Sequence, residues 1–200
     1  MLVKECSWNN IFRSDDAFNK LYPKGIETKA TKHWTRLEVA KCAADFLAAQ
    51  NRVRVLDIGS GVGKFCLAAA QYKPHAVFCG IEQRKYLVDY AIDCSNKLDL
   101  PNVSFVHGNF TQLDLGKFDH FYFYNSFYEN LDGTDKIDNS IEHSVSLFNY
   151  YNRYLYKQLE QRRTGTRIAT FHSLEVEIPP SYYVVKTEFE GLLKFWVKAQ

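Results

Sequence analysis

Hydrophobic positions along this chain follow two alternating patterns. Compact apolar runs rich in β-branched and aromatic residues predict buried strands, and they lie at 53–58, 76–81, 103–106, 118–124 and 167–171. Between them, apolar residues recur every three or four positions, which predicts amphipathic helices at 35–49, 64–72, 84–98 and 139–163. The last two runs, 182–189 and 192–197, predict an antiparallel hairpin. Strands that alternate with helices in this order predict a doubly wound α/β fold.

The first predicted strand runs directly into a glycine loop. Asp57 lies in this strand, and Gly59, Gly61 and Gly63 follow at alternate positions. Glycines permit a tight turn and let a ligand approach the backbone closely. The helix that follows directs its free N–H groups at the same loop. These features together indicate a site for a nucleotide-like cofactor.

The spacing of the glycines separates the kinds of nucleotide loop. A phosphate-binding P-loop is disfavoured, because Ile58 and Phe65 stand where that motif needs Gly and Ser or Thr. A dinucleotide loop is also disfavoured, because Lys64 replaces its third glycine. The observed pattern, Asp-x-Gly-x-Gly-x-Gly, resembles motif I of the class I S-adenosylmethionine (SAM) methyltransferases. A tight strand-to-helix turn without a ligand is the simpler alternative.

Residues at the ends of the next two strands resemble the same superfamily. Glu82, at the end of the second strand, is placed to accept hydrogen bonds from both hydroxyls of a ribose. In class I enzymes a polar and an apolar residue after the third strand flank the adenine, and Asn109 and Phe110 stand at these two positions here. The simpler alternatives are that Glu82 is a solvated turn residue, and that Asn109 lies in a turn while Phe110 packs in the core. The resemblance implies SAM as the cofactor, with contacts from Asp57, Gly59, Ser60, Gly61, Gly63, Glu82, Gln83, Asn109 and Phe110.

The fourth strand ends in a candidate acceptor motif. The segment Asn125-Ser126-Phe127-Tyr128 resembles the Asn-Pro-Pro-Tyr motif of methyltransferases that act on planar nitrogen atoms, without its two prolines. It is also similar to the Asn-Asn-Phe segment of the non-SET histone lysine methyltransferases. The resemblance implies that Asn125 positions the acceptor nitrogen and Tyr128 stacks on the substrate, both as catalytic residues, while Phe127 shapes the pocket. Alternatively, Asn125 only caps the end of a strand.

The residues before the first long helix form a separate segment. We expect residues 1–34 to be a lid or a packing segment, and residues 35–200 to form one SAM-binding domain. The helix begins with Thr35-Arg36-Leu37-Glu38, a capping-box signature. His33 and Trp34 stand where they could cover the methyl donor or contact the substrate. Equally, Trp34 could pack onto the helix as the apolar residue before its cap.

Composition narrows the choice of partners and compartment. The net charge is +2 and no basic block occurs, so a protein amine or a small molecule is expected as acceptor in preference to a nucleic acid. The five cysteines are scattered without zinc-site spacing, which predicts free thiols. No apolar run reaches the ~20 residues of a membrane span, and the N-terminus lacks a signal-peptide core. A cytoplasmic protein without a bound metal is expected, although Asp132, Asp135 and Asp138 lie close together in sequence.

The sequence therefore predicts a SAM-dependent methyltransferase that acts by direct displacement, with nitrogen as the favoured acceptor atom. Two alternatives remain. One is a non-catalytic module that binds SAM or docks to a partner. The other is an NAD(P)-dependent enzyme with a Rossmann fold.

Overall fold

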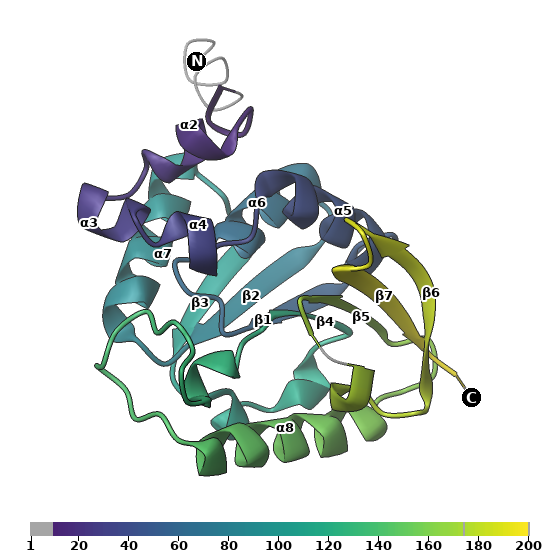
Figure 1. The fold of residues 1–200 in the computed structure, drawn as a ribbon. Coiled ribbons are helices and arrows are strands. Elements are labelled where there is room, and N and C mark those ends of the chain that lie inside the picture. Colours follow the sequence, from purple (N-terminus) through teal and green to yellow (C-terminus); the bar gives the residue numbers. More distant parts are fainter. Residues whose placement is uncertain (1–9, 174, 200) are drawn as a thin grey trace.

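A single seven-stranded sheet forms the centre of the molecule (Figure 1). The computed structural model describes residues 10–173 and 175–199. The strands are β1 (Arg54–Ile58), β2 (Val77–Glu82), β3 (Val103–His107), β4 (His120–Tyr124), β5 (Arg167–Phe171), β6 (Tyr182–Glu188) and β7 (Leu193–Lys198). Their order is β3-β2-β1-β4-β5-β7-β6, with β1 to β5 parallel and β7 antiparallel to both β5 and β6. The expected α/β class, with its mostly parallel sheet and antiparallel C-terminal hairpin, is confirmed.

Helices cover the two faces of the sheet unequally (Figure 1). The first face carries α5 (Leu37–Leu47), α6 (Lys64–Tyr72) and α7 (Lys85–Leu98), and the second carries α8 (Val145–Glu160). Within β1, Val55 packs into the first core and Leu56 into the second, since successive side chains of a strand point to opposite faces. Both faces of the central strands are therefore buried, which explains their nearly continuous hydrophobic sequence. Among the described residues, no helix has the length and apolar character needed to cross a lipid bilayer.

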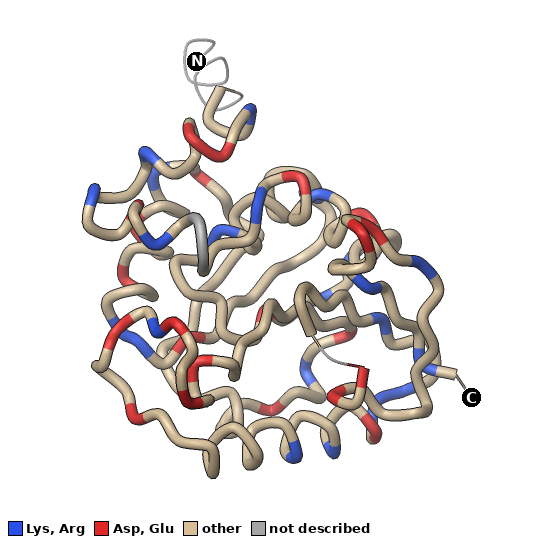
Figure 2. The backbone as a smooth tube through the Cα atoms, in the orientation of Figure 1, with Lys and Arg blue, Asp and Glu red and all other residues tan. Residues whose placement is uncertain are grey.

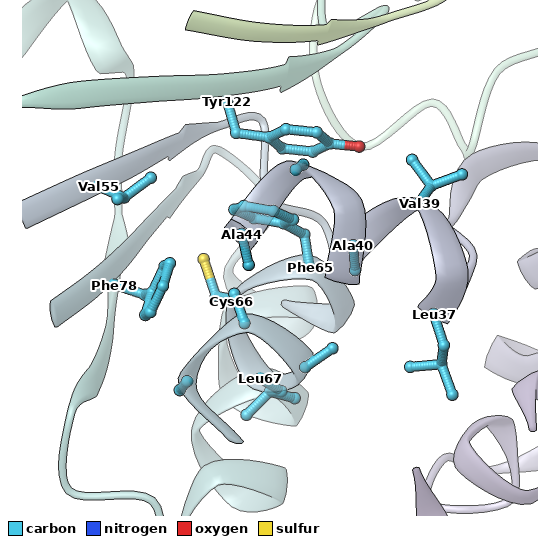
Figure 3. Packing of buried hydrophobic residues seen from close by; sticks show 14 of the residues in the cluster. Leu37, Val39, Ala40, Ala44, Val55, Phe65, Cys66, Leu67, Phe78 and Tyr122 are labelled. Carbon is cyan, nitrogen blue, oxygen red and sulfur yellow. The ribbon is translucent and has the colours of Figure 1, made fainter. Parts of the chain in front are cut away.

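The first core lies directly beneath the end of the sheet that carries the glycine loop. Figure 3 shows the ring of Tyr122 in β4 lying over Phe65 of α6. The two rings are stacked, with centroids 3.8 Å apart and planes 13° from parallel. The same stretch of α6 also places Cys66 beside Phe78 of β2 in this core. The helix that begins at the loop is thus held rigidly against the sheet.

Helix α8 is shorter than the sequence pattern predicts. The helix expected at 139–163 begins only at Val145 and ends at Glu160. The hydroxyl of Ser144 caps it by accepting a hydrogen bond from the backbone N–H of Leu147 at 3.2 Å. Residues 131–144 contain no helix or strand and form a long loop instead. Its position matters for the site described below.

The N-terminal segment packs against the glycine loop. Its described part contains three short helices, α2 (Asp15–Asn19), α3 (Lys24–Glu27) and α4 (Ala30–His33). Phe18 is completely buried, and the hydroxyl of Tyr22 donates a hydrogen bond to the carbonyl of Val62 at 2.9 Å. These contacts attach its described part to the rest of the molecule, and whether the segment is a lid or a packing segment stays a prediction.

Asp15 of this segment caps the next helix. The backbone N–H of Leu37, the first residue of α5, donates to the Asp15 carboxylate at 3.0 Å. The capping box expected at Thr35 is wrong, because the Thr35 hydroxyl bonds instead to that of Tyr122 at 2.9 Å. Asp15 also accepts a hydrogen bond from the buried ammonium group of Lys64. One carboxylate therefore links the N-terminal segment to both α5 and the start of α6.

Candidate active site

The glycine loop, residues 59–63, turns the chain from β1 into α6. Gly59, Gly61 and Gly63 have positive φ angles of 75°, 53° and 81°. The backbone N–H of Gly59 donates to the carbonyl of Ile81 at 3.0 Å, which ties the loop to β2. All three glycines therefore adopt the left-handed backbone that other residues rarely adopt.

Two of these glycines are required for different reasons. A Cβ atom at Gly63 would lie 2.5 Å from the ring of Phe105 and 2.9 Å from the Cβ of Ala91. A Cβ atom at Gly61 would have no heavy atom within 4 Å. Packing against α7 and β3 thus demands glycine at position 63. At position 61 the space beside the backbone is open, and this residue lines a cavity.

Gly63→Ala is expected to lower the free energy of unfolding by about 3 kcal/mol, the sum of left-handed strain and overpacking. Gly61→Ala is the matched control, because it has the strain without the clash and should cost about 1 kcal/mol. Urea denaturation of the three proteins measures both effects. Equal losses for the two variants would contradict the packing role of Gly63.

A cavity of about 350 Å³ opens at the carboxyl ends of β1, β2 and β4. Nine of the residues expected from the sequence line it: His33, Gly59, Gly61, Glu82, Gln83, Phe110, Asn125, Phe127 and Tyr128. A second cavity of about 30 Å³ shares Gly59, Gly61 and His33 with the first. It is also lined by three further expected residues: Trp34, Asp57 and Ser60. Residues that are far apart in sequence are thus brought around two neighbouring cavities that share part of their lining.

Asn109 lies outside both cavities. Its amide nitrogen donates to the hydroxyl of Tyr151 at 2.8 Å and to Gln83 at 3.3 Å. Its amide oxygen accepts hydrogen bonds from the backbone N–H and the hydroxyl of Thr111, at the start of the 3₁₀ turn η1 (Phe110–Gln112). In this arrangement the side chain of Asn109 faces Gln83 and Tyr151, and the adenine contact expected of it stays a prediction. Asn109 fixes Gln83 and Tyr151, which do line the larger cavity.

Glu82 holds its carboxylate against the glycine loop. The backbone N–H of Gly61 donates to one of its oxygens at 3.2 Å, and that of Arg84 donates to the other at 2.9 Å. Burial raises the pKa of Glu82 above its ordinary value, although these hydrogen bonds and the charge of Arg84 oppose the rise. Each carboxylate oxygen has a second lone pair, so the group can still accept hydrogen bonds from a ligand.

Asp57 lines the smaller cavity from β1. The thiol of Cys66 lies 3.6 Å from its carboxylate and donates to it. Burial raises the pKa of Asp57 to about 8, although the Cys66 hydrogen bond opposes the rise. At neutral pH the side chain is therefore mostly protonated. A cationic ligand group in the cavity would favour its ionised form.

The segment after β4 forms the other side of the larger cavity. Asn125 has a φ angle of 51°, a left-handed conformation that few residues other than glycine adopt. Among the described residues, no hydrogen bond is made by its side-chain amide. The rings of Phe127 and Phe110 stack with centroids 5.1 Å apart, and Tyr128 is 48% exposed. An unpaired amide beside a half-exposed aromatic ring suits the recognition of a planar polar group.

Sequence reasoning missed one wall of the cavity. The loop at 131–144 contributes Asp135, Ile137, Ile141 and His143, and Arg84 lies beneath it. The helix predicted at 139–163 wrongly included residues 139–144, which belong to this loop. The available signal was Ser144, a good N-cap residue placed just before the true start of α8.

No group of three or more His, Cys, Asp or Glu side chains in the described part of the chain could hold a metal ion. The loop residues Asp132, Asp135 and Asp138 therefore do not form such a group. Cys42, Cys66, Cys79 and Cys94 are free thiols, and Cys6 lies outside the described residues.

Part of the chain matches known methyltransferase sequences. Residues 51–120 match a family model described as a putative methyltransferase. The chain is 46% identical over 54 residues to the tRNA (guanine-N(7)-)-methyltransferase of Synechococcus sp. strain JA-3-3Ab. It is 48% identical over 54 residues to the protein of that name from Microcystis aeruginosa. Each match covers 27% of this chain, and 23% and 26% of the relatives, so it spans about a quarter of their length.

Solved structures resemble the chain over most of its length. TrmN from Thermus thermophilus aligns with a TM-score of 0.60 at 18% identity, over 88% of this chain and 52% of that one. Magnesium protoporphyrin IX methyltransferase (ChlM) from Synechocystis PCC 6803 also aligns with a TM-score of 0.60, at 15% identity, over 98% and 97%. At these identities the likeness shows the fold, which is that of the class I methyltransferases. The expected resemblance to this superfamily is confirmed, without a single family inside it.

The expected preference for a protein or small-molecule acceptor over a nucleic acid is wrong. Three matched relatives are named as tRNA (guanine-N(7)-)-methyltransferases, and this finding overturns the preference. The preference rested on the net charge of +2, which averages over the whole chain. Figure 2 shows that acidic residues gather in places, for example along the loop at 131–144. An average over the chain therefore does not describe the charges at any one surface.

Proposed function

We propose that this chain is a SAM-dependent methyltransferase whose acceptor is a nitrogen atom of an RNA base. The observation that carries the proposal is the cavity of about 350 Å³, which brings Gly61, Glu82 and Asn125 together at the ends of three neighbouring strands. Ligands of open α/β sheets bind at this edge. The family match over residues 51–120 and the class I fold support the same activity.

The residues present fit SAM. The open space beside Gly61 admits a ligand that a long side chain there would displace. Glu82 can accept hydrogen bonds from ribose hydroxyls, and Phe110 offers an apolar surface to the adenine. Asp57 lines the smaller cavity, where its ionised carboxylate would attract the ammonium group of SAM. When bound, SAM supplies an electrophilic methyl carbon on a sulfonium.

The chain's own task is to align an acceptor with that carbon and to exclude water. The amide oxygen of Asn125 can accept a hydrogen bond from an N–H group of a base, which orients the attacking nitrogen. Tyr128, half-exposed at the cavity, offers a ring on which an unstacked base can stack. The tRNA methyltransferases that match the chain support an RNA base as the planar group.

Binding and transfer assays test the two parts of this proposal. Calorimetry should show binding of S-adenosylhomocysteine (SAH) with a Kd on the order of 10 µM, and no comparable binding of NAD⁺. With methyl-labelled SAM and fractionated cell extract, the label should enter RNA. After nuclease digestion it should be found in an N-methylated nucleoside.

Different results would overturn different parts. Tighter binding of NAD⁺ than of SAH would reject the cofactor. Label in the protein fraction would reject the RNA acceptor alone. SAH binding without transfer to any fraction would indicate a module that binds SAM without turnover.

A further inference from the structure

The loop at residues 131–144, called the acceptor-side loop below, forms a wall of the cavity without any regular structure. It contributes Asp135, Ile137, Ile141 and His143 to the lining. In Figure 1 it is the green segment that leads into α8 beside the lower end of α7. Irregular loops of this length inside a compact domain are uncommon and are usually functional. What holds this one in place is therefore informative.

Arg84 binds the acceptor-side loop from beneath. Its side chain is 3% exposed. Its Nη2 atom lies 2.6 Å from Glu129 Oε2, and its Nε atom lies 3.1 Å from Asp138 Oδ1. The same Nη2 atom is 3.4 Å from Nε2 of His143. One buried guanidinium thus joins the middle of the loop at Asp138, its end at His143 and the turn that precedes it at Glu129.

Arg84 also holds Glu82. Its backbone N–H donates to Glu82 Oε1 at 2.9 Å, and its guanidinium Nη1 lies 3.6 Å from the same oxygen. The other oxygen of Glu82 accepts the hydrogen bond from Gly61. Contacts therefore run without a break from the glycine loop through Glu82 and Arg84 to Asp138.

Asp138 is the outer end of this chain of contacts. Burial alone would raise its pKa, but hydrogen bonds from Ser140, Tyr86 and Arg84 hold the pKa below its usual value. Asp138 therefore remains ionised and paired with Arg84 at physiological pH. The loop has a further attachment at its middle, where the ammonium of Lys29 donates to the carbonyl of Ile137 at 2.6 Å.

We propose that Arg84 is a positioning residue that couples occupation of Glu82 by the cofactor to how firmly the acceptor-side loop is held in place. This inference rests on the proposed function, because it takes Glu82 as the carboxylate that binds the cofactor ribose. Ribose hydroxyls on Glu82 fix the orientation of the carboxylate that Arg84 contacts. The same guanidinium then holds Glu129, which lines the cavity, and Asp138, which anchors the loop that forms a wall of the cavity.

Two physical consequences follow. Coupling between two sites is reciprocal, so loosening the loop at Asp138 weakens cofactor binding at Glu82. The geometry also requires arginine, because its planar fork reaches several acceptors at fixed angles, whereas a lysine ammonium is a single point charge. Arg84→Lys therefore keeps the charge but loses most of the coupling.

Hydrogen exchange with and without SAH tests the coupling. In the wild-type protein, SAH should slow amide exchange in residues 131–144 by about tenfold, a coupling of ordinary size. In Asp138→Ala the same amount of bound SAH should slow it by less than about twofold, and SAH affinity should fall by about threefold to tenfold. Arg84→Lys should behave like Asp138→Ala.

Lys85→Met is the matched control, since Lys85 is the neighbouring cation but is 68% exposed and, within residues 10–173 and 175–199, pairs with Asp89 alone. It should keep the wild-type response. Thermal unfolding of each variant separates loss of coupling from loss of the fold. SAH binding without protection in the wild type, or full protection in Asp138→Ala, would overturn the coupling alone. A wild-type protein that does not bind SAH would overturn the proposed function and the coupling together.

Discussion

Gly61→Arg is expected to weaken SAH binding by more than about 100-fold while the protein remains folded. Gly61 lines both cavities, and no atom of the protein lies within 4 Å of the place where its side chain would begin. A long side chain there fills the space that the cofactor needs. The φ angle of 53° adds strain of about 1–2 kcal/mol, which a typical domain tolerates. Calorimetric titration with SAH measures the affinity.

The control for this substitution is Gly61→Ala, which carries the same backbone strain but little bulk. It should lose at most about tenfold in affinity and show a urea midpoint close to that of Gly61→Arg. If Gly61→Arg bound SAH as tightly as Gly61→Ala, the open space beside Gly61 would have no part in binding the cofactor. If Gly61→Arg failed to fold, the space beside Gly61 would not be open as described above.

Asn125→Ala is expected to lower kcat for methyl transfer by about 100-fold and to leave SAH affinity within about twofold of the wild type. The amide lies at the carboxyl end of β4, on the opposite side of the cavity from Glu82, and is not needed to hold the loop. Its loss removes the group that orients the acceptor nitrogen. Single-turnover transfer from labelled SAM to RNA gives the rate, and calorimetry gives the affinity.

A second variant separates chemistry from backbone strain. Because Asn125 has a φ angle of 51°, alanine adds strain at this position, whereas glycine relieves it. Asn125→Gly should therefore be at least as stable as the wild type and yet transfer methyl groups as slowly as Asn125→Ala. Full transfer activity in either variant would show that Asn125 does not position the acceptor.

The residues proposed to bind the cofactor could be grouped from the sequence because their signals are local. Gly59, Gly61 and Glu82 each stand at the end of a predicted strand, and parallel strands bring their carboxyl ends to one edge of a sheet. Spacing alone therefore placed these residues together. The hydrogen bonds that Asn109 makes to Gln83 and Tyr151 could not be predicted in this way, because no pattern of residue types encodes them.

The acceptor side of the site could not be predicted in full, because it is held by contacts between residues that are far apart in the sequence. Arg84 meets Glu129, Asp138 and His143 across separations of 45, 54 and 59 residues. Likewise, Asp15 caps α5 from 22 residues away, so the nearer Thr35 was the wrong choice. Net charge was equally uninformative about the acceptor, since it sums over surfaces that do not face the site.

The contacts of the N-terminal segment affect the order in which parts of the protein unfold. Tyr22 and Asp15 reach the glycine loop and Lys64 across 40 and 49 residues, so these contacts form only after β1 and α6 are in place. Contacts that form late in folding are expected to open first under mild denaturation. The cofactor loop then loses its support while the sheet is still intact. Mild denaturation would thus release the cofactor before it unfolds the sheet.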